Sequence, residues 1–346
     1  MKNETTTVVI TGSQGFIGGY LVRELLHQGY KVIGVDNYSK YGEVKRDHDS
    51  HPNFNLIIED LSKTNEGLTL ALQDAQHLIA GAAKIGGISY FHTYAYDLLA
   101  HNEKIMANTC DAAIEAHKNY KLKKMTYLSS SMVFENTNKW PSSEGDQFHI
   151  PPPSSSYGFQ KLAVEYFAKA AWDQYQLPYT IIRVFNCVGI GEARALNAKS
   201  ILSGDVELAM SHVLPDLIQK ILKGQNPLRI LGEGNQIRHL TYGQDLARGI
   251  ALTLNSDLTL NNDLNISTNE GITVLDLARK IWIKIKGPSI PFNYVCEEPF
   301  PHDVQKRIPD TSKIRNMLGF EAKTTIDQVL DEVIPWVKNA IESKII

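Results

Sequence analysis

The sequence predicts an α/β protein in which a doubly wound parallel sheet is followed by a smaller mixed α/β lobe at the C-terminus. Three observations support this fold class. A glycine-rich turn joins the first apolar strand to the first helix, strands and helices alternate through the first half, and the alternation weakens after about residue 185. With 346 residues, the chain is long enough for a large core and more than one lobe.

The first strand, turn and helix form a unit typical of phosphate binding. An apolar run at 8–10 predicts a buried strand, and Gly12, Gly15 and Gly18 follow before a helix that we expect at 16–27. The first glycine permits a tight turn, the second lets the backbone approach a pyrophosphate, and the third lets the helix pack closely on the strand. A pyrophosphate would lie at the positive N-terminal end of that helix. The pattern favours a Rossmann-type dinucleotide site over an ordinary glycine-rich turn.

The second strand, expected at 31–35, ends in an acidic residue that bears on the choice of cofactor. Asp36 stands where a carboxylate accepts a hydrogen bond from an adenosine 2′-hydroxyl, which favours NAD. A 2′-phosphate at this position would meet a like charge. The next three residues include no arginine, and Lys40 is the nearest cation, which would restore NADP binding if its loop folded back.

The remaining elements of the first half continue the alternation. After a polar loop at 37–53, we expect strands at 54–59, 77–80, 123–128 and 179–184, and helices at about 66–73, 98–117 and 157–175. Ligands of such sheets bind beyond the C-terminal strand ends. Those ends carry Gly12, Asp36, Asp60, Gly81 and Ser130.

The second half predicts a different organisation. A long loop at 189–206 precedes a helix at about 214–223, the segment 232–240 is glycine-rich and polar, and the C-terminal third mixes short helices with short strands. We therefore expect an NAD-binding Rossmann domain at 1–185, to which about 240–267 returns. The rest of 186–346 is expected to be mainly a substrate-binding lobe.

Composition and charge argue against several kinds of partner. The net charge of −3 is spread along the chain, which disfavours a nucleic-acid surface and a polybasic membrane patch. Residues 1–7 are too polar for a signal peptide, and no apolar run approaches 18 residues. The three cysteines show no disulfide or metal spacing, and the histidines form no H-x-x-x-H pair. We therefore expect free thiols, a cytoplasmic location and no metal.

A tyrosine and a lysine four residues apart are candidates for acid–base chemistry. Tyr157 and Lys161 begin a predicted helix and lie on one face of it, where the lysine and a bound nicotinamide would lower the pKa of the phenol. Ser130, at a neighbouring strand end, is placed to hydrogen-bond the same substrate oxygen. A tyrosine and a lysine at this spacing are also common on solvated helix faces. Here the pair follows a predicted sheet with a glycine-rich turn and a serine cluster, which favours a role for the tyrosine as general acid/base.

Eight short motifs occur in the order of a known enzyme family. They are T-G-S-Q-G-F-I-G at 11–18, D-N at 36–37, D-L at 60–61, S-S-S-M-V-F at 129–134, Y-G-F-Q-K at 157–161, R-V-F-N at 183–186, S-H-V-L-P at 211–215 and G-E-G-N-Q-I-R at 232–238. On these motifs, nearly the whole chain resembles the extended short-chain dehydrogenase/reductase family, in its nucleoside-diphosphate-sugar epimerase and dehydratase branch.

The resemblance implies roles for individual residues. Tyr157 would be the base, Lys161 would bind a ribose and lower the tyrosine pKa, and Ser130 would polarise the substrate oxygen. The expected NAD contacts are Gly12, Gly15, Phe16, Ile17, Gly18, Asp36, Asn37, Asp60, Leu61, Ala80, Gly81, Ala82, Asn102, Ser129, Tyr157, Lys161 and Phe185. The expected contacts of a nucleoside-diphosphate sugar are Lys84, Ser131, Asn186, His212, Val213, Arg238 and Arg307. Arg238 would pair bidentately with the diphosphate, with an ordinary surface arginine as the alternative.

Departures from the family pattern narrow the chemistry. Dehydratases of the family have Thr-Asp-Glu where this chain has Ser130, Ser131 and Met132, and methionine cannot move a proton. Enzymes of the GDP-fucose synthase type resemble the chain at A-A-K-I-G-G-I (82–88) and at His212. They nevertheless carry a cysteine where Met132 stands, and that cysteine is needed for proton transfer at the α-carbon.

A further departure lies near 298–303. Many relatives have an arginine just before the aspartate of this stretch, where it grips the diphosphate. Here Phe300 and Pro301 occupy the region, so that Lys306 or Arg307 would take over the contact.

The leading interpretation is an NAD-dependent epimerase that inverts C4 of a nucleoside-diphosphate sugar through a transient 4-keto sugar. The alternatives are an NAD(P)-dependent 4-keto-sugar reductase/epimerase of GDP-fucose synthase type, a nucleotide-sugar dehydratase, and a catalytically silent NAD-binding scaffold. The sequence specifies neither the base nor the sugar. Apolar stripes on the helices at 98–117 and 157–175 also predict a homodimer joined by two helices of each subunit.

Overall fold

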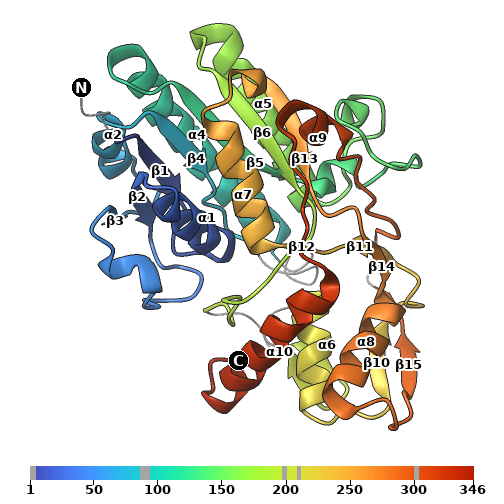
Figure 1. Ribbon diagram of the computed structural model, residues 1–346. Coiled ribbons are helices and arrows are strands. Elements are labelled where there is room, and N and C mark those ends of the chain that lie inside the picture. The colour runs from blue at the N-terminus through green and yellow to red at the C-terminus, as the bar shows by residue number, and fades with distance from the viewer. Residues whose placement is uncertain (1–4, 86–93, 197–200, 209–211, 300–303) are drawn as a thin grey trace.

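A parallel sheet of seven strands forms the centre of the larger part of the molecule (Figure 1). The computed structural model describes residues 5–85, 94–196, 201–208, 212–299 and 304–346. The strands lie in the order β3 (Phe54–Ile58), β2 (Lys31–Asp36), β1 (Thr7–Thr11), β4 (His77–Ala80), β5 (Lys124–Ser130), β6 (Tyr179–Val184) and β13 (Asn262–Ile266), and every neighbouring pair is parallel. This confirms the predicted fold class. The chain order reverses between β1 and β4, which is where ligands of open α/β sheets bind.

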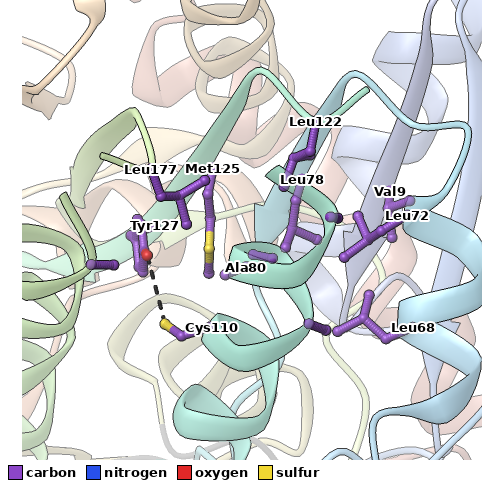
Figure 2. Close-up of a cluster of buried hydrophobic side chains, with 14 of the residues drawn as sticks. Val9, Leu68, Leu72, Leu78, Ala80, Cys110, Leu122, Met125, Tyr127 and Leu177 are labelled. Atoms are coloured by element: carbon purple, nitrogen blue, oxygen red, sulfur yellow. Dashed lines mark hydrogen bonds between the residues drawn. The ribbon is translucent and has the colours of Figure 1, made fainter. Parts of the chain in front are cut away.

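Helices cover both faces of this sheet. One face carries α2 (Glu66–Leu72), α4 (Ala95–Asn119) and α5 (Ser156–Tyr175), and the other carries α1 (Phe16–His27), α7 (Gly243–Leu254) and α9 (Ser312–Leu318). Because alternate strand residues point to opposite faces, Val9 lies in the first buried cluster, whereas Val8 and Ile10 lie in the second. Figure 2 shows the first cluster, in which the Cys110 thiol of α4 lies 3.6 Å from the Tyr127 hydroxyl of β5.

The smaller part of the molecule packs three helices against a two-stranded parallel sheet. It contains α6 (Val213–Leu222), α8 (Val274–Lys286), α10 (Ile326–Glu342), β10 (Leu228–Leu231) and β15 (Tyr294–Glu297). Its core includes Leu217, Ile281 and Val333, one from each helix. Three further pairs join β7 (Cys187–Val188) to β12 (Thr241–Tyr242), β11 (Ile237–His239) to β14 (Gly271–Thr273) and β8 (Ile201–Ser203) to β9 (Val206–Leu208). Figure 1 shows β11, β12 and β14 between the two parts.

Most elements lie within three residues of their predicted positions. Short 3₁₀ helices at Asp47–Ser50, Ser131–Phe134, Asp146–Phe148 and Asp257–Thr259 were not expected. The loop expected at 189–206 also contains β8, and the expectation of only short helices near the C-terminus is wrong, because α8 and α10 have 13 and 17 residues. From the segment 240–267, α7 packs on the large sheet and β13 forms its edge. None of the helices in the described part of the chain combines the length and the apolar character that crossing a bilayer requires.

A buried ionic network joins α5 to the edge strand β13 and its neighbour β6. Glu165 of α5 and Arg183 of β6 are both fully buried, and the Arg183 guanidinium donates to both Glu165 oxygens at 2.8 and 2.7 Å. The same guanidinium lies 2.7 Å from Asp263 of β13, whose other oxygen lies 2.9 Å from the Lys313 ammonium. Burial opposes the charge on Asp263, but Arg183 and Lys313 lower its pKa to about 2.

Because of Asp263, the free energy of unfolding should depend on pH in the acid range. A carboxyl whose pKa is depressed on folding stabilises the fold above its unfolded pKa of about 3.9, and it loses that contribution as the pH falls towards 2. We predict that Asp263→Asn lowers the free energy of unfolding at pH 7 by about 2 kcal/mol and flattens its decline below pH 4. Urea unfolding at a series of pH values measures both effects. Asp327→Asn, in an exposed pair with Lys280, is the control and should change stability by less than about 1 kcal/mol. Equal acid slopes for wild type and Asp263→Asn would contradict the assignment.

Candidate active site

A cavity of about 480 Å³ lies at the C-terminal edge of the parallel sheet. Its lining comes from the turns after β1, β2, β3, β4, β5 and β6, and from α6, β8, β10, β11, β15 and α8. Both parts of the molecule therefore contribute to it. Its volume is in the range of cavities that hold small organic ligands.

The cavity brings together most of the residues selected from the sequence. The lining residues from the dinucleotide and catalytic sets are Gly12, Gly15, Phe16, Ile17, Gly18, Asp36, Asn37, Asp60, Leu61, Gly81, Ala82, Ser129, Ser130, Tyr157 and Lys161. Those from the substrate set are Lys84, Ser131, Asn186, His212, Val213, Arg238 and Arg307. Residues from the beginning and the end of the chain thus share one cavity.

Three of the residues expected to contact the cofactor lie behind the cavity wall instead. Ala80 is buried inside β4, and Phe185 is buried against Phe134, with ring centroids 6.3 Å apart. The buried Asn102 side chain exchanges two hydrogen bonds with the Lys84 backbone, at 2.7 and 2.9 Å. These three residues therefore support the lining rather than form it.

The turn after β1 has the geometry that an anion site requires. Gly12 has φ +75°, and its N–H donates to the Val35 carbonyl at 2.8 Å. A Cβ on Gly18 would lie 2.0 Å from the Gly12 carbonyl oxygen, so only glycine allows α1 to approach so closely. Gly15 is the N-cap of α1 and provides no side chain to cap the helix. The first N–H groups of α1 are thus presented to the cavity, where they and the helix dipole favour a phosphate.

The carboxylate of Asp36 is held in place by the backbone. One oxygen accepts from the Gln14 N–H at 3.0 Å, and the other accepts from the Tyr38 N–H at 2.8 Å. Lys40 does not fold back to Asp36, because its ammonium lies over the Tyr41 ring, 4.9 Å from the centroid. The Asp36 carboxylate therefore suits a free ribose hydroxyl, and the cation nearest to it is Arg46, which donates to the Gln14 carbonyl at 2.6 Å.

The three candidate catalytic residues meet where β5 and α5 face the cavity. Ser130 ends β5, and its Oγ accepts from the Met132 N–H at 3.2 Å. Tyr157 and Lys161 lie in the first two turns of α5, with the lysine ammonium 5.9 Å from the tyrosine ring centroid. That ammonium also donates to the Leu128 carbonyl of β5 at 3.0 Å. Strand and helix thus converge on one wall of the cavity.

The pKa values of this group depend on burial and on charges from distant loops. Burial raises the pKa of Tyr157 above that of an ordinary phenol, while Ser130, Arg307 and Lys40 act in the opposite direction. Burial lowers the pKa of Lys161 to about 8. We expected Lys161 to depress the tyrosine pKa, but the cations that do so in this structure are Arg307 and Lys40. A positive charge bound beside the phenol would lower its pKa further.

The basic residues expected at the diphosphate differ in their positions. Arg307 lines the cavity and donates to the Asn186 side-chain oxygen at 3.3 Å, whereas Lys306 lies 5.0 Å over the Trp140 ring and off the lining. Arg238 lines the cavity and is nine-tenths buried. Of Lys306 and Arg307, the two candidates for the diphosphate contact in this region, the structure thus favours Arg307. Some positions of the discussed motifs lie outside the described residues, namely 86–88, 211 and 300–303.

Several charged residues of the lining were missed by the sequence analysis of the site, among them Glu192. Glu192 hydrogen-bonds His212, and both side chains line the cavity. Burial opposes the charge on Glu192, but His212 and Lys40 shift its pKa below the ordinary value. Glu192 lies in a loop without a motif, so no local signal marked it, and Lys40 was considered only as a cation near Asp36. In the described ranges, no group of three His, Cys, Asp or Glu side chains is placed to hold a metal ion.

Comparison with known proteins identifies the family. Residues 8–267 match the family described as "NAD dependent epimerase/dehydratase family". The chain belongs to this family. It is 25% identical to a putative UDP-glucose 4-epimerase of Methanocaldococcus jannaschii, covering 96% of this chain and 98% of that one. It is 26% identical to UDP-N-acetyl-alpha-D-glucosaminuronate decarboxylase of Bacillus cytotoxicus, covering 95% and 97%. The solved structure of MoeE5 in complex with UDP-glucuronic acid and NAD has a TM-score of 0.78 and 26% identity, covering 96% and 99%.

The close approach of α1 to the turn after β1 gives a paired test. We predict that Gly18→Ala weakens NAD binding at least tenfold and lowers the melting temperature, because its Cβ would meet backbone atoms that cannot move aside. Gly19→Ala is the matched control, since no atom lies within 4 Å of its Cβ and alanine is the better helix former. Calorimetric titration of both variants with NAD measures the difference. Equal affinities would show that the turn does not hold the cofactor.

Proposed function

We propose that this chain is an NAD-dependent epimerase of a nucleoside-diphosphate sugar, acting at C4. The observation that carries the proposal is the convergence of Ser130, Tyr157 and Lys161 on a cavity that Arg238 and Arg307 also line. The first three residues suit the oxidation of a hydroxyl, and the two arginines suit a diphosphate. Family membership and the NAD and UDP-glucuronic acid bound by MoeE5 support the same assignment.

The residues of the larger part fit NAD. Side chains at Gly12 and Gly18 would collide with backbone, and their absence leaves the N-terminus of α1 open to a pyrophosphate. The Asp36 carboxylate suits the adenosine ribose. When bound, NAD supplies the acceptor and the donor of the hydride at C4. We assign residues 1–185 and about 240–267 to NAD binding, and the rest of 186–346 mainly to the sugar nucleotide.

The side chains around the sugar remove one proton from it and later return a proton to it. Tyr157 removes the proton of the C4 hydroxyl during oxidation and returns it to the keto oxygen during reduction. Ser130 hydrogen-bonds this oxygen, the positive charges of Arg307 and Lys40 favour the phenolate form of the tyrosine, and Lys161 binds a ribose of the cofactor. Between the two steps the sugar turns over in the cavity. Arg238 and Arg307 keep the diphosphate bound while it turns.

Met132 separates this reaction from its alternatives. Its side chain is buried and packs with Leu98 and Tyr157 in an apolar cluster. A thioether neither gives up nor takes a proton at neutral pH, so Met132 provides no group for water elimination or for exchange at the carbons beside the ketone. The proposal therefore favours inversion at C4 over dehydration and 3,5-epimerisation.

The proposal includes a cytoplasmic homodimer joined by α4 and α5. The three cysteines are free, as in a reducing compartment. Ile105 and Cys110 of the predicted apolar stripe are buried in the core of the subunit itself. Tyr96, Phe159 and Tyr166 of the same two helices are instead 80%, 48% and 58% exposed, and a second copy would cover them. Light scattering at micromolar concentration tests this against the chain mass of 38.7 kDa.

A panel of nucleotide sugars tests the reaction and its acid/base together. We predict that the protein converts at least one UDP-, GDP-, CDP- or dTDP-sugar into its C4 epimer without net reduction of NAD. Tyr157→Phe should lose at least about a hundredfold in kcat while binding NAD normally, because it keeps the ring and removes the ionisable oxygen. Tyr166→Phe, an exposed position on the same helix, is the control and should keep full activity. Near wild-type turnover by Tyr157→Phe would remove this residue from the mechanism, and stoichiometric consumption of NADPH would favour the reductase.

A further inference from the structure

An ion pair lines the part of the cavity formed by the smaller lobe. Arg229 of β10 donates through Nη1 to Glu297 of β15 at 2.9 Å, and both side chains line the cavity. Along β10, Leu228 and Ile230 point into the core and Arg229 points out, as strand alternation requires. The side chains of Arg229 and Glu297 are 44% and 28% exposed, so a ligand can reach both.

The surroundings hold this pair in a fixed position. The other oxygen of Glu297 accepts from the Ser203 hydroxyl of β8 at 3.3 Å. Buried Gln225 donates to the Ser203 carbonyl at 2.7 Å and accepts from the Arg229 N–H at 3.0 Å, which fastens β8 to the start of β10. Gly204, with φ +61°, lies so close that a Cβ there would be 2.5 Å from the Arg229 Nε. The hairpin of β8 and β9 thus packs directly against the guanidinium.

A carboxylate beside a guanidinium has a definite hydrogen-bonding preference. The carboxylate only accepts, and the guanidinium only donates. Guanine presents two adjacent donors, N1–H and the 2-amino group, next to the O6 acceptor, and cytosine presents its 4-amino group next to N3 and O2. Uracil and thymine present carbonyl oxygens on both sides of one N–H, so that a carboxylate would face at least one acceptor. The pair therefore matches a base with an exocyclic amino group.

We propose that Arg229 and Glu297 select a nucleotide whose base carries an exocyclic amino group, such as guanine or cytosine, over a uracil or thymine nucleotide at this site. The inference rests on the proposed function, which places the diphosphate at Arg238 and Arg307 in the same cavity. Glu297 accepts from the amino group of the base, and Arg229 donates to the neighbouring acceptor. Apolar side chains of Leu231 and Val274 line the same lobe of the cavity and suit the faces of a base.

Titration of NAD-saturated protein with four nucleoside diphosphates tests this inference. Saturation with NAD keeps the nucleotides out of the dinucleotide site. We expect GDP or CDP to bind at least about fivefold more tightly than both UDP and dTDP, the lower end of what one well-matched base contact contributes. Glu297→Gln should move the preference towards UDP, because a carboxamide donates and accepts side by side, as uracil does. Arg229→Met should remove the preference.

The control is Lys280→Met. It breaks an exposed ion pair of the same lobe that does not line the cavity, and it should leave the ranking of the four nucleotides unchanged. The wild-type ranking decides the inference even where a variant fails to fold. Binding of UDP or dTDP as tight as that of GDP and CDP overturns the inference and leaves the proposed function standing. Failure of all four to bind the NAD-saturated protein overturns both.

Discussion

The buried pair of Glu165 and Arg183 is the interaction on which the geometry of the site depends. Glu165 also accepts from the Ser129 hydroxyl at 2.7 Å and from Gln147 at 3.2 Å, so one carboxylate joins α5, β5 and β6. Ser129 immediately precedes Ser130, and Glu165 follows Lys161 by one helical turn. The pair therefore fixes Ser130 relative to Tyr157 and Lys161. Removing one partner of such a buried pair typically costs about 3–5 kcal/mol, because the other charge is left unpaired.

The parts of the fold that the sequence predicted are those with local causes. Gly12 and Gly18 are required by a positive φ and by a backbone contact within the same turn, and both requirements show as glycine spacing. Asp36 follows directly from its strand end. The strand order itself could be anticipated only as a parallel sheet, but parallel strands bring their C-terminal ends to one edge. This constraint explains why residues far apart in sequence meet in the cavity.

The parts that the sequence did not predict have causes that act over long distances. Glu192 meets the site from a loop that carries no motif, and its partner His212 belongs to another segment. Asn102 is a polar residue of a type that contacts cofactors, but it hydrogen-bonds the Lys84 backbone behind the cavity wall. The periodicity of the sequence cannot distinguish these two roles. Arg229 belongs to a strand that is too short to show a reliable alternation of polar and apolar residues. The partial opposition of Arg307 and Lys40, rather than Lys161, to the burial that raises the Tyr157 pKa has the same origin.

The central claim is that hydride leaves C4 and returns to C4 within one cavity, with no proton exchange at neighbouring carbons. The most direct measurement follows the isotope at each carbon by NMR, once a substrate is known. A sugar deuterated at C4 should give an epimer that keeps its deuterium at C4, and unlabelled substrate in D₂O should take up none. Deuterium from solvent at C3 or C5, or transfer of the C4 label into released reduced cofactor in step with product, would contradict the account.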